Sequence, residues 1–185
     1  MTTEAPTKMT TWTADPMHSI AEFAVKHFVV TTVKGRFRDL EATLHIDEAN
    51  PENSWAQATI AVASVDTNVE IRDNDLRSDN FFSADKFPYI TFRSTRVERL
   101  DEERFRLIGD LTIRDVTKEV VLDGEFEGQI DDPYGNRRAA FTATTRIKRS
   151  DYGMRWNQVI EGGGVTVSDD VKTTLHIEAV RQKEE

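Results

Sequence analysis

The sequence of 185 residues contains no cysteine. This absence excludes a disulfide framework, zinc sites built on thiolates, redox cysteine pairs and cysteine nucleophiles. No apolar run is long enough for a secretory signal or a membrane-spanning helix, and the first residues, MTTEAPTKMTTWT, are mostly polar. We therefore expect a cytoplasmic protein without stable membrane insertion, or a periplasmic or secreted one if a signal peptide has been removed from this chain.

Basic residues are outnumbered, with 24 Lys and Arg against 33 Asp and Glu and a net charge of -9. Such a charge repels a phosphate backbone, so we expect no nucleic acid as partner. The balance reverses between Arg137 and Trp156, where Asp151 is the single acidic residue. This stretch is either a solvated strand face with its loop, or a cationic rim that binds an anionic lipid head group through arginine forks. Its basic residues are Arg137, Arg138, Arg146, Lys148, Arg149 and Arg155.

Sequence motifs of enzymes are also missing. The chain has no Gly-x-Ser-x-Gly elbow, no phosphate-binding loop and no His-Glu-x-x-His. The four histidines are too far apart in the sequence for a local metal motif. We therefore expect no catalytic residues, no metal site and no cofactor.

Apolar and polar residues alternate with a period of two through most of the chain. In the segment 105–113, for example, Phe105, Leu107 and Leu111 share one face, and most residues of the other face are polar or charged. This pattern predicts a half-buried antiparallel strand. Eight such segments are predicted: 20–25, 40–46, 55–65, 89–97, 105–113, 120–126, 141–147 and 171–179.

The segments are joined by turns and lack the long helical crossovers that parallel strands need. The sequence DDPYGN at 131–136, for example, supplies Pro133 and Gly135, which favour a hairpin. Antiparallel strands with one apolar face each can close into a barrel, which removes exposed edges. We predict an all-β fold with a single eight-stranded antiparallel barrel over residues 11–181, and we expect residues 1–10 and 182–185 to be disordered.

The stretch 64–95 interrupts this alternation. Asn68 can cap a short helix that runs through Leu76. The chain becomes extended again at Phe87, because a residue that precedes a proline disfavours the helical region. Phe81 and Phe82 lie between these points. We therefore predict a short helix and an aromatic flap between two strands, placed at the mouth of the barrel.

The interior of an eight-stranded barrel is either filled by its own side chains or holds one small ligand. Small residues at apolar positions leave space if they face inward, or else they pack against aromatic residues of opposite strands. Both interpretations remain open at this point. The small residues are Ala21, Ala24, Ala42, Gly109, Ala143 and Ala179.

Five phrases cover nearly the whole chain: WTADPMHSIAEFAVKHF (12–28), VKGRF (33–37), IGDLTIRDVTKEVVL (108–122), RSDYGM (149–154) and VSDDVKTTLHIEA (167–179). In this order they resemble the YceI-like family of lipid-binding proteins, which are often described as polyisoprenoid-binding. Asp115 departs from the family pattern, which usually has glycine after Ile-Arg. The resemblance implies a lipocalin-like antiparallel barrel.

The resemblance implies a lipid-binding protein that sequesters or carries a long-chain isoprenoid, such as a polyprenyl or quinone-like amphiphile, inside the barrel. Binding would be largely hydrophobic, at about 0.8 kcal/mol for each buried methylene. We expect this lipid as the partner, and a monomer or a homodimer. Phe81 and Phe82 are the preferred ligand contacts, because aromatic residues on a connection have less reason to be core. The predicted lining is Phe23, Val25, Phe28, Phe37, Phe81, Phe82, Phe92, Leu107, Leu111, Ile113, Phe126, Phe141 and Trp156.

Several polar residues are candidates for contact with the lipid head group: His18, Ser19, Arg72, Asp73, Arg149 and Arg155. Two other functions remain open. One is a lipocalin-like enzyme or isomerase whose polar centre at the cavity mouth is formed by His18, Arg72 and Asp73. The other is a stress-related interaction module with a filled core.

Overall fold

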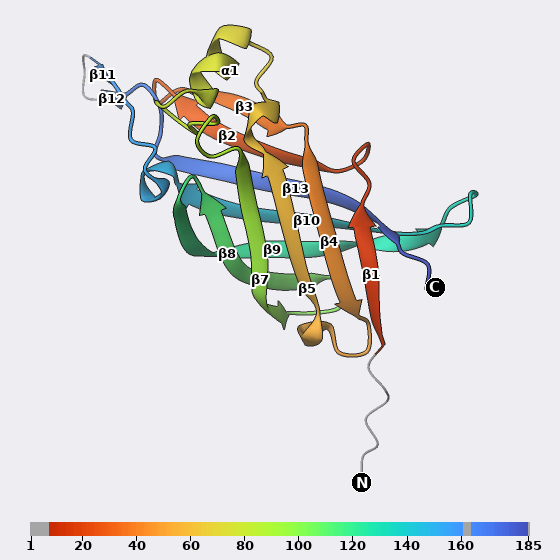
Figure 1. The fold of residues 1–185 in the computed structure, drawn as a ribbon. Coiled ribbons are helices and arrows are strands. Elements are labelled where there is room, and N and C mark those ends of the chain that lie inside the picture. The colour runs from red at the N-terminus through yellow and green to blue at the C-terminus, as the bar shows by residue number, and fades with distance from the viewer. Residues whose placement is uncertain (1–7, 161–163, 185) are drawn as a thin grey trace.

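The structure, a computed structural model, describes residues 8–160 and 164–184. Its main feature is a closed antiparallel barrel of eight strands (Figure 1). Around the barrel the order is β1 (Met9–Ala14), β4 (Leu40–Asp47), β5 (Trp55–Ala61), β7 (Tyr89–Arg99), β8 (Arg104–Ile113), β9 (Val116–Asp131), β10 (Arg137–Lys148) and β13 (Asp170–Arg181). The barrel closes where Trp12 of β1 pairs with Arg181 of β13. The predicted fold class is therefore confirmed.

Further strands extend the wall at one end. The first half of β13 pairs with β2 (Ile20–His27), and β2 is followed in the sheet by β3 (Thr31–Phe37) and β6 (Val65–Asp66). β13 thus pairs with β2 along its first half and with β1 along its last residues. A separate short hairpin joins β11 (Val159–Ile160) and β12 (Gly164–Val165). Three 3-10 helices occupy Pro51–Asn53, Val62–Ser64 and Arg149–Tyr152.

Four described strands were not expected from the sequence: β1, β3, β11 and β12. The predicted strand 20–25 is β2, which lies outside the closed ring, where β1 takes its place. One reason that β1 was not predicted is that residues 1–10 were expected to be disordered. That prediction is wrong for Met9 and Thr10, which belong to β1. Thr10 is buried between polar partners: its Oγ1 accepts from Trp12 Nε1 (2.8 Å) and donates to the Ile46 carbonyl (3.2 Å). Because a threonine occupies an inward position, the apolar alternation is weak at this strand.

The remainder of the predicted termini is only partly described. Residues 1–7 and 185 lie outside the described residues. Residues 182–184 carry no regular secondary structure. The backbone N–H of Gln182 donates to the Thr11 carbonyl at 2.8 Å, and Lys8 pairs with Glu184 at 2.9 Å. The two ends of the barrel domain are therefore joined beside β1.

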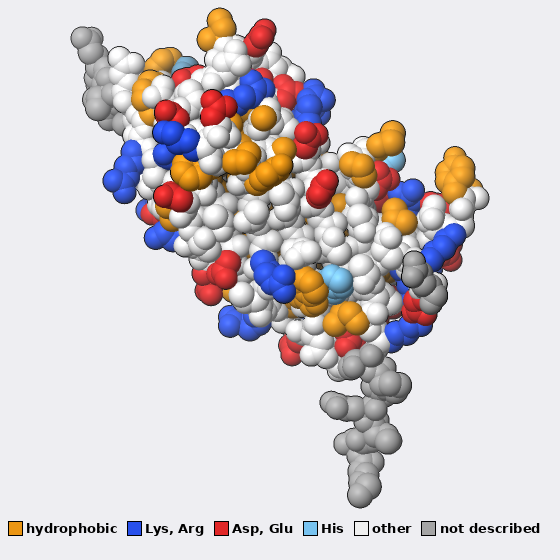
Figure 2. All heavy atoms as spheres, viewed as in Figure 1, with side chains coloured by type: hydrophobic (Ala, Val, Ile, Leu, Met, Phe, Trp, Pro, Cys, Tyr) orange, Lys and Arg blue, Asp and Glu red, His pale blue; other side chains and the backbone are white. Residues whose placement is uncertain are grey.

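The predicted helix and flap are present between β6 and β7. The helix α1 (Glu70–Arg77) lies over one end of the barrel, and Figure 2 shows hydrophobic side chains at the surface around it. The predicted cap is wrong, since Val69 holds the N-cap position and no side chain caps the helix. Asn68 instead has a φ of 63° and turns the chain from β6 into the helix. Asparagine tolerates this left-handed conformation better than most residues.

The hairpins follow the turn residues. Between β9 and β10 the N–H of Asp132 donates to the Asn136 carbonyl (2.8 Å), and Gly135 has a φ of 86°. The predicted turn is therefore confirmed. Between β8 and β9 the positive φ of 57° falls on Arg114. The position that holds Asp115 in place of the family's glycine therefore does not require glycine.

Aromatic rings cover glycines on the inner wall. The Phe23 ring lies over Gly35, its partner on the next strand, so that a Cβ added to this glycine would be 2.3 Å from the ring. The Phe92 ring covers Gly109 in the same way, at 2.7 Å. The inward space at Gly109 is therefore filled, contrary to one interpretation of the small residues. Each ring lies along the wall instead of crossing the interior.

Two groups of buried side chains flank the interior. The larger group lies at the α1 end and contains Phe37, Leu40, Val65 and Ile90. The smaller group surrounds Trp12, which is fully buried together with Ala139 and Ala179. No described helix is long and apolar enough to cross a membrane.

Candidate functional site: an apolar cavity inside the barrel

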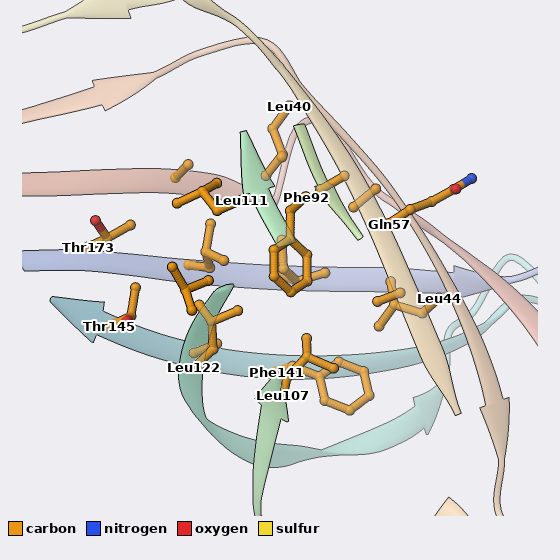
Figure 3. A pocket seen from close by; sticks show the side chains of 18 of the residues that line it. Leu40, Leu44, Gln57, Phe92, Leu107, Leu111, Leu122, Phe141, Thr145 and Thr173 are labelled. Carbon is orange, nitrogen blue, oxygen red and sulfur yellow. The ribbon is translucent and has the colours of Figure 1, made fainter. Parts of the chain in front are cut away.

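The barrel encloses a cavity of about 540 Å³. This volume lies within the range of about 300 to 1,000 Å³ that small-molecule sites occupy. Figure 3 shows the side chains of Leu107, Leu111 and Phe141 projecting into it from β8 and β10. The interior is therefore not filled by its own side chains, as the interaction-module alternative would require.

The alternation of the strands explains why the wall is apolar. On β10, Phe141, Ala143 and Ile147 line the cavity, and their inward partners on β13 are Ile177, Leu175 and Val171. On these two strands, the lining residues with a hydroxyl are Thr145 and Thr173, which pair with each other across β10 and β13 (Figure 3). The middle of the cavity can therefore solvate a hydrocarbon and gives a charged group no partner.

One end of the cavity is bordered by acidic turns. Asp47 is fully buried and accepts from the backbone N–H of Asn50 (2.9 Å), which is the main reason that its pKa is lowered. Asp101 in the β7–β8 hairpin accepts from the backbone N–H of Arg104 (2.7 Å), and this bond is the largest cause that lowers the pKa of Asp101 to about 2. Both carboxylates therefore remain charged and stabilise their turns by accepting these backbone hydrogen bonds.

The flap closes the α1 end. Phe82 packs edge-on against Phe37, with ring centroids 5.5 Å apart, and both line the cavity. Phe81 is buried and lies against Trp156, with centroids 5.6 Å apart. The flap aromatics predicted from the sequence thus form the apolar wall at this end.

Arg149 is a buried cation beside the flap, with 5 % of its surface exposed. Its guanidinium donates to four backbone carbonyls: Ser168 (3.0 Å), Met154 (2.9 Å), Trp156 (2.8 Å) and Val167 (3.2 Å). Burial lowers the pKa of Arg149, and the nearby Asp169 opposes this effect. Since a guanidinium has five N–H donors, Arg149 holds residues 154–156 against residues 167–168 and keeps one donor uncommitted to these carbonyls.

The predicted lining residues lie on the cavity wall, with two exceptions. Phe28 is at the β2–β3 turn outside the barrel, 45 % exposed, with its ring 3.9 Å from that of His27. Trp156 supports Phe81 from behind and does not reach the cavity. Further wall residues lie on apolar strand faces that the sequence had indicated but were not named as lining: Leu40, Leu44, Ile60, Ile90, Leu122, Val171, Leu175 and Ile177.

Among the polar head-group candidates, only Arg149 borders the cavity. Ser19 is buried against β13, where its Oγ donates to the Glu178 carbonyl (3.2 Å). Arg72 and Asp73 both bond to Thr67, at 2.8 and 2.6 Å, and so join α1 to the residue that follows β6. Arg155 is exposed and does not line the cavity. These four residues and His18 therefore do not line the cavity, and the site expected from the sequence is corrected in this respect.

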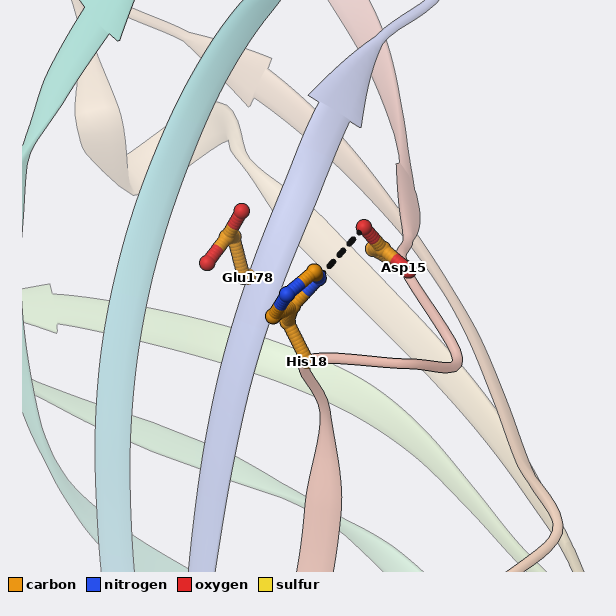
Figure 4. Close-up of side chains that lie close together, drawn as sticks. All are labelled: Asp15, His18 and Glu178. Carbon is orange, nitrogen blue, oxygen red and sulfur yellow. Dashed lines mark hydrogen bonds and ion pairs between the residues drawn. The ribbon is translucent and has the colours of Figure 1, made fainter.

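His18 belongs to a cluster on the outside of the barrel (Figure 4). Its Nδ1–H donates to Asp15 Oδ2 (2.9 Å), and Arg138 Nη1 donates to the same oxygen (2.8 Å) and to Glu178 Oε1 (2.9 Å). The His18 bond is the largest cause that lowers the pKa of Asp15 to about 2, and the same bond raises the pKa of His18. Because Arg138 already pairs with both carboxylates, we interpret the cluster as a clamp that joins the β1–β2 turn to β10 and β13.

These contacts also bear on the enzyme alternative. His18 contacts Asp15, whereas Arg72 and Asp73 contact Thr67 near α1. The three side chains thus belong to two separate hydrogen-bond clusters. They do not form the shared polar centre that this alternative assumed.

The hydroxyl of Tyr152 is buried and has no hydrogen-bond partner among the described residues. Burial raises the pKa of Tyr152 to about 12. A buried hydroxyl without a partner costs roughly 1 to 3 kcal/mol. We therefore expect Tyr152→Phe to increase the free energy of unfolding by about 1 kcal/mol in urea titrations. A decrease would show that the hydroxyl is satisfied in solution, for example by a bound water.

A closed antiparallel barrel with an apolar interior and a flap over one end defines a lipocalin-like barrel. The chain belongs to the YceI-like family, because the YceI-like domain matches residues 12–179.

Individual relatives agree with this assignment. The chain is 40% identical over 166 residues to the UPF0312 protein ECA1782 of Pectobacterium atrosepticum. The matched residues cover 90% of this chain and 83% of that protein. The crystal structure of a Campylobacter jejuni YceI protein matches with a TM-score of 0.74 and 36% identity, over 86% of this chain and 90% of that one. A polyisoprenoid-binding domain from Saccharophagus degradans matches in fold, with a TM-score of 0.67 and 16% identity over 95% of this chain and 100% of that one.

Proposed function

We propose that this protein binds a long-chain isoprenoid in the barrel interior and sequesters or carries it. The observation that carries the proposal is the apolar cavity inside the barrel, whose middle has aliphatic and aromatic walls. Each methylene that moves from water into such a cavity contributes about 0.8 kcal/mol, so a chain of several isoprene units binds without a charged anchor. The polyisoprenoid-binding S. degradans domain, which shares this fold, supports the choice of ligand class.

The charges at the hairpin end of the cavity bear on the charge of the lipid head group. The hairpin end places the carboxylates of Glu48, Asp101, Glu102 and Glu103 around the cavity. Arg99 and Arg104 also lie there, and Arg104 pairs with Asp101 at 2.7 Å, so acidic groups remain in excess. An anionic head group at this end would meet like charges, which disfavours a diphosphate there. An uncharged head group, such as a quinone or an alcohol, avoids this repulsion. We therefore propose an uncharged isoprenoid whose head faces the hairpin end.

Native mass spectrometry of the freshly purified protein, followed by organic extraction, tests the proposal. We expect a stoichiometric adduct whose mass identifies a prenyl chain. If the protein is purified empty, it should take up a polyprenol or a prenylquinone more tightly than the corresponding prenyl diphosphate. An empty protein that takes up none of the three would contradict the proposed function.

A further inference from the structure

The outer wall formed by β3, β2, β13 and β10 carries a row of basic residues. The strand registers place Lys34 opposite Ala24, Ala24 opposite Lys172, and Lys172 opposite Arg146. Residues that are directly opposite on neighbouring strands project to the same face of a sheet. Val171 and Thr173, the neighbours of Lys172, line the cavity, so the row faces outward.

Two more cations lie beside this row on the side of the β2–β3 turn. Lys26 follows Ala24 by two residues on β2, and Lys148 follows Arg146 by two residues on β10. All of these basic side chains are exposed. We call this set the basic wall: Lys26, Lys34, Arg146, Lys148 and Lys172.

The cations of the basic wall form no ion pair with a carboxylate of the described residues. None of its five cations lies within 4.0 Å of a carboxylate oxygen of a described residue, although Asp170 is the register partner of Lys148. Other basic residues on the surface do form such pairs, for example Arg106 with Asp123. A positive surface whose cations form no such pairs, on a chain of net charge -9, is a local feature that favours an anionic partner.

The β2–β3 turn next to the basic wall exposes three consecutive apolar residues. Phe28, Val29 and Val30 are 45, 61 and 77 % exposed. Phe28 and Val29 have φ angles of 48° and 66°, a conformation that hairpin turns normally assign to Asn-Gly. A β-branched residue at positive φ is strained, so this turn carries a conformational penalty while it places hydrocarbon in water.

We propose that the basic wall and the Phe28–Val30 turn dock the protein on an anionic lipid bilayer. The cations would lie against lipid phosphates, and each strengthens attachment to such a surface about fivefold. The apolar turn would enter the boundary between head groups and acyl chains, as the apolar side of a peripheral membrane protein does. Nucleic acid could also pair with the cations, but it offers no apolar phase for the turn.

The docking surface is continuous with the cavity wall. Phe23 and Val25 line the cavity from the same strand that ends in the apolar turn. A docked protein would therefore hold one side of its cavity near the bilayer. The docking does not depend on what the cavity holds, whereas its use for collecting or delivering a lipid rests on the proposed function.

Vesicle flotation tests the docking. We expect the protein to float with vesicles made of equal parts phosphatidylglycerol and phosphatidylcholine, and to remain behind with phosphatidylcholine alone. The triple variant Lys34→Glu, Arg146→Glu and Lys172→Glu should bind the anionic vesicles at least about tenfold more weakly. The matched control reverses three exposed charges on the outer wall of β7 and β8, through Arg93→Glu, Arg96→Glu and Arg106→Glu, and should bind like wild type.

A turn variant separates docking from misfolding. Phe28→Asn with Val29→Gly supplies the residues that this turn geometry favours, so it should be at least as stable as wild type while it binds anionic vesicles several-fold more weakly. If wild type fails to float, or binds a single-stranded oligonucleotide instead, the proposal is overturned. Uptake of a prenyl lipid from cyclodextrin, without vesicles, should be unchanged in the triple variant. Loss of docking can thus be told apart from failure of the cavity.

Discussion

Replacing Ala143 with phenylalanine is expected to abolish most lipid uptake while the barrel stays folded. Ala143 lines the cavity from β10, opposite Leu175 on β13 and Gly124 on β9. A phenyl ring at this position would extend into the cavity, where it meets space instead of a packed core, so overpacking should be small. If the ring displaces about three methylene groups of the ligand, the loss is about 2.4 kcal/mol, or roughly fifty-fold in affinity.

Thr142→Phe is the matched control for this variant. Thr142 is the preceding residue of the same strand and pairs with His176, on the outer face. It adds the same ring to the barrel exterior and should leave uptake unchanged. Urea unfolding of both variants checks that the fold is retained. If folded Ala143→Phe protein takes up the lipid as well as wild type does, the ligand does not occupy the barrel interior. The Ala143→Phe protein should still float with anionic vesicles, because the substitution leaves the docking surface unchanged.

Removal of the Arg149 side chain is expected to cause the largest loss of stability. In Arg149→Met the carbonyls of Met154, Val167 and Ser168 lose the donor that they share in wild type. Bonds to a charged donor are worth roughly 1.5 to 3 kcal/mol each, and burial of the cation offsets part of that sum. We expect the free energy of unfolding in urea to fall by about 3 kcal/mol. Amide exchange should also become faster in the segment 154–168.

Arg155→Met provides the comparison, because Arg155 is exposed and lies six residues further along the chain. Its stability should stay within about 0.5 kcal/mol of wild type, as for most surface substitutions. Arg149→Lys should lie between the two, since an ammonium group keeps the charge but cannot reproduce the planar fork. Equal losses in Arg149→Met and Arg155→Met would show that the carbonyl contacts contribute nothing to stability.

The barrel could be predicted from the sequence because its strands follow a simple rule. Alternation in segments such as 105–113 identified the inward face, and the cavity wall contains Leu107 and Leu111 as expected. The same rule explains one error: Phe28 is out of phase with Phe23 and Val25, so the alternation itself argues against an inward position. β1 was harder to recognise, because an inward Thr10 interrupts the apolar pattern.

The polar contacts could not be predicted from local sequence. Arg138 reaches Asp15 across 123 positions of the chain, and Ser19 bonds to the backbone of Glu178 across 159. Arg149 binds backbone carbonyls. Because every residue carries a carbonyl, no pattern of side chains indicates which residues Arg149 contacts. Alternation reports which way a side chain faces, but it holds no information about which distant strand lies beside it.

Where an aromatic ring lies over a glycine, the interior width of the barrel depends on both residues together. If Phe23 were shortened alone, it would leave the bare backbone of Gly35 facing the interior, and a side chain at Gly35 alone would collide with the ring. Gly109 differs, because a Cβ there would also meet the backbone of Arg93 and Ser94, at 2.5 and 2.7 Å, so it must stay glycine whatever replaces Phe92. The effects of changes at Phe23 and Gly35 cannot simply add, because each residue sets the space that the other fills. A redesign that alters the width of this container at that pair must therefore exchange both of its members at once.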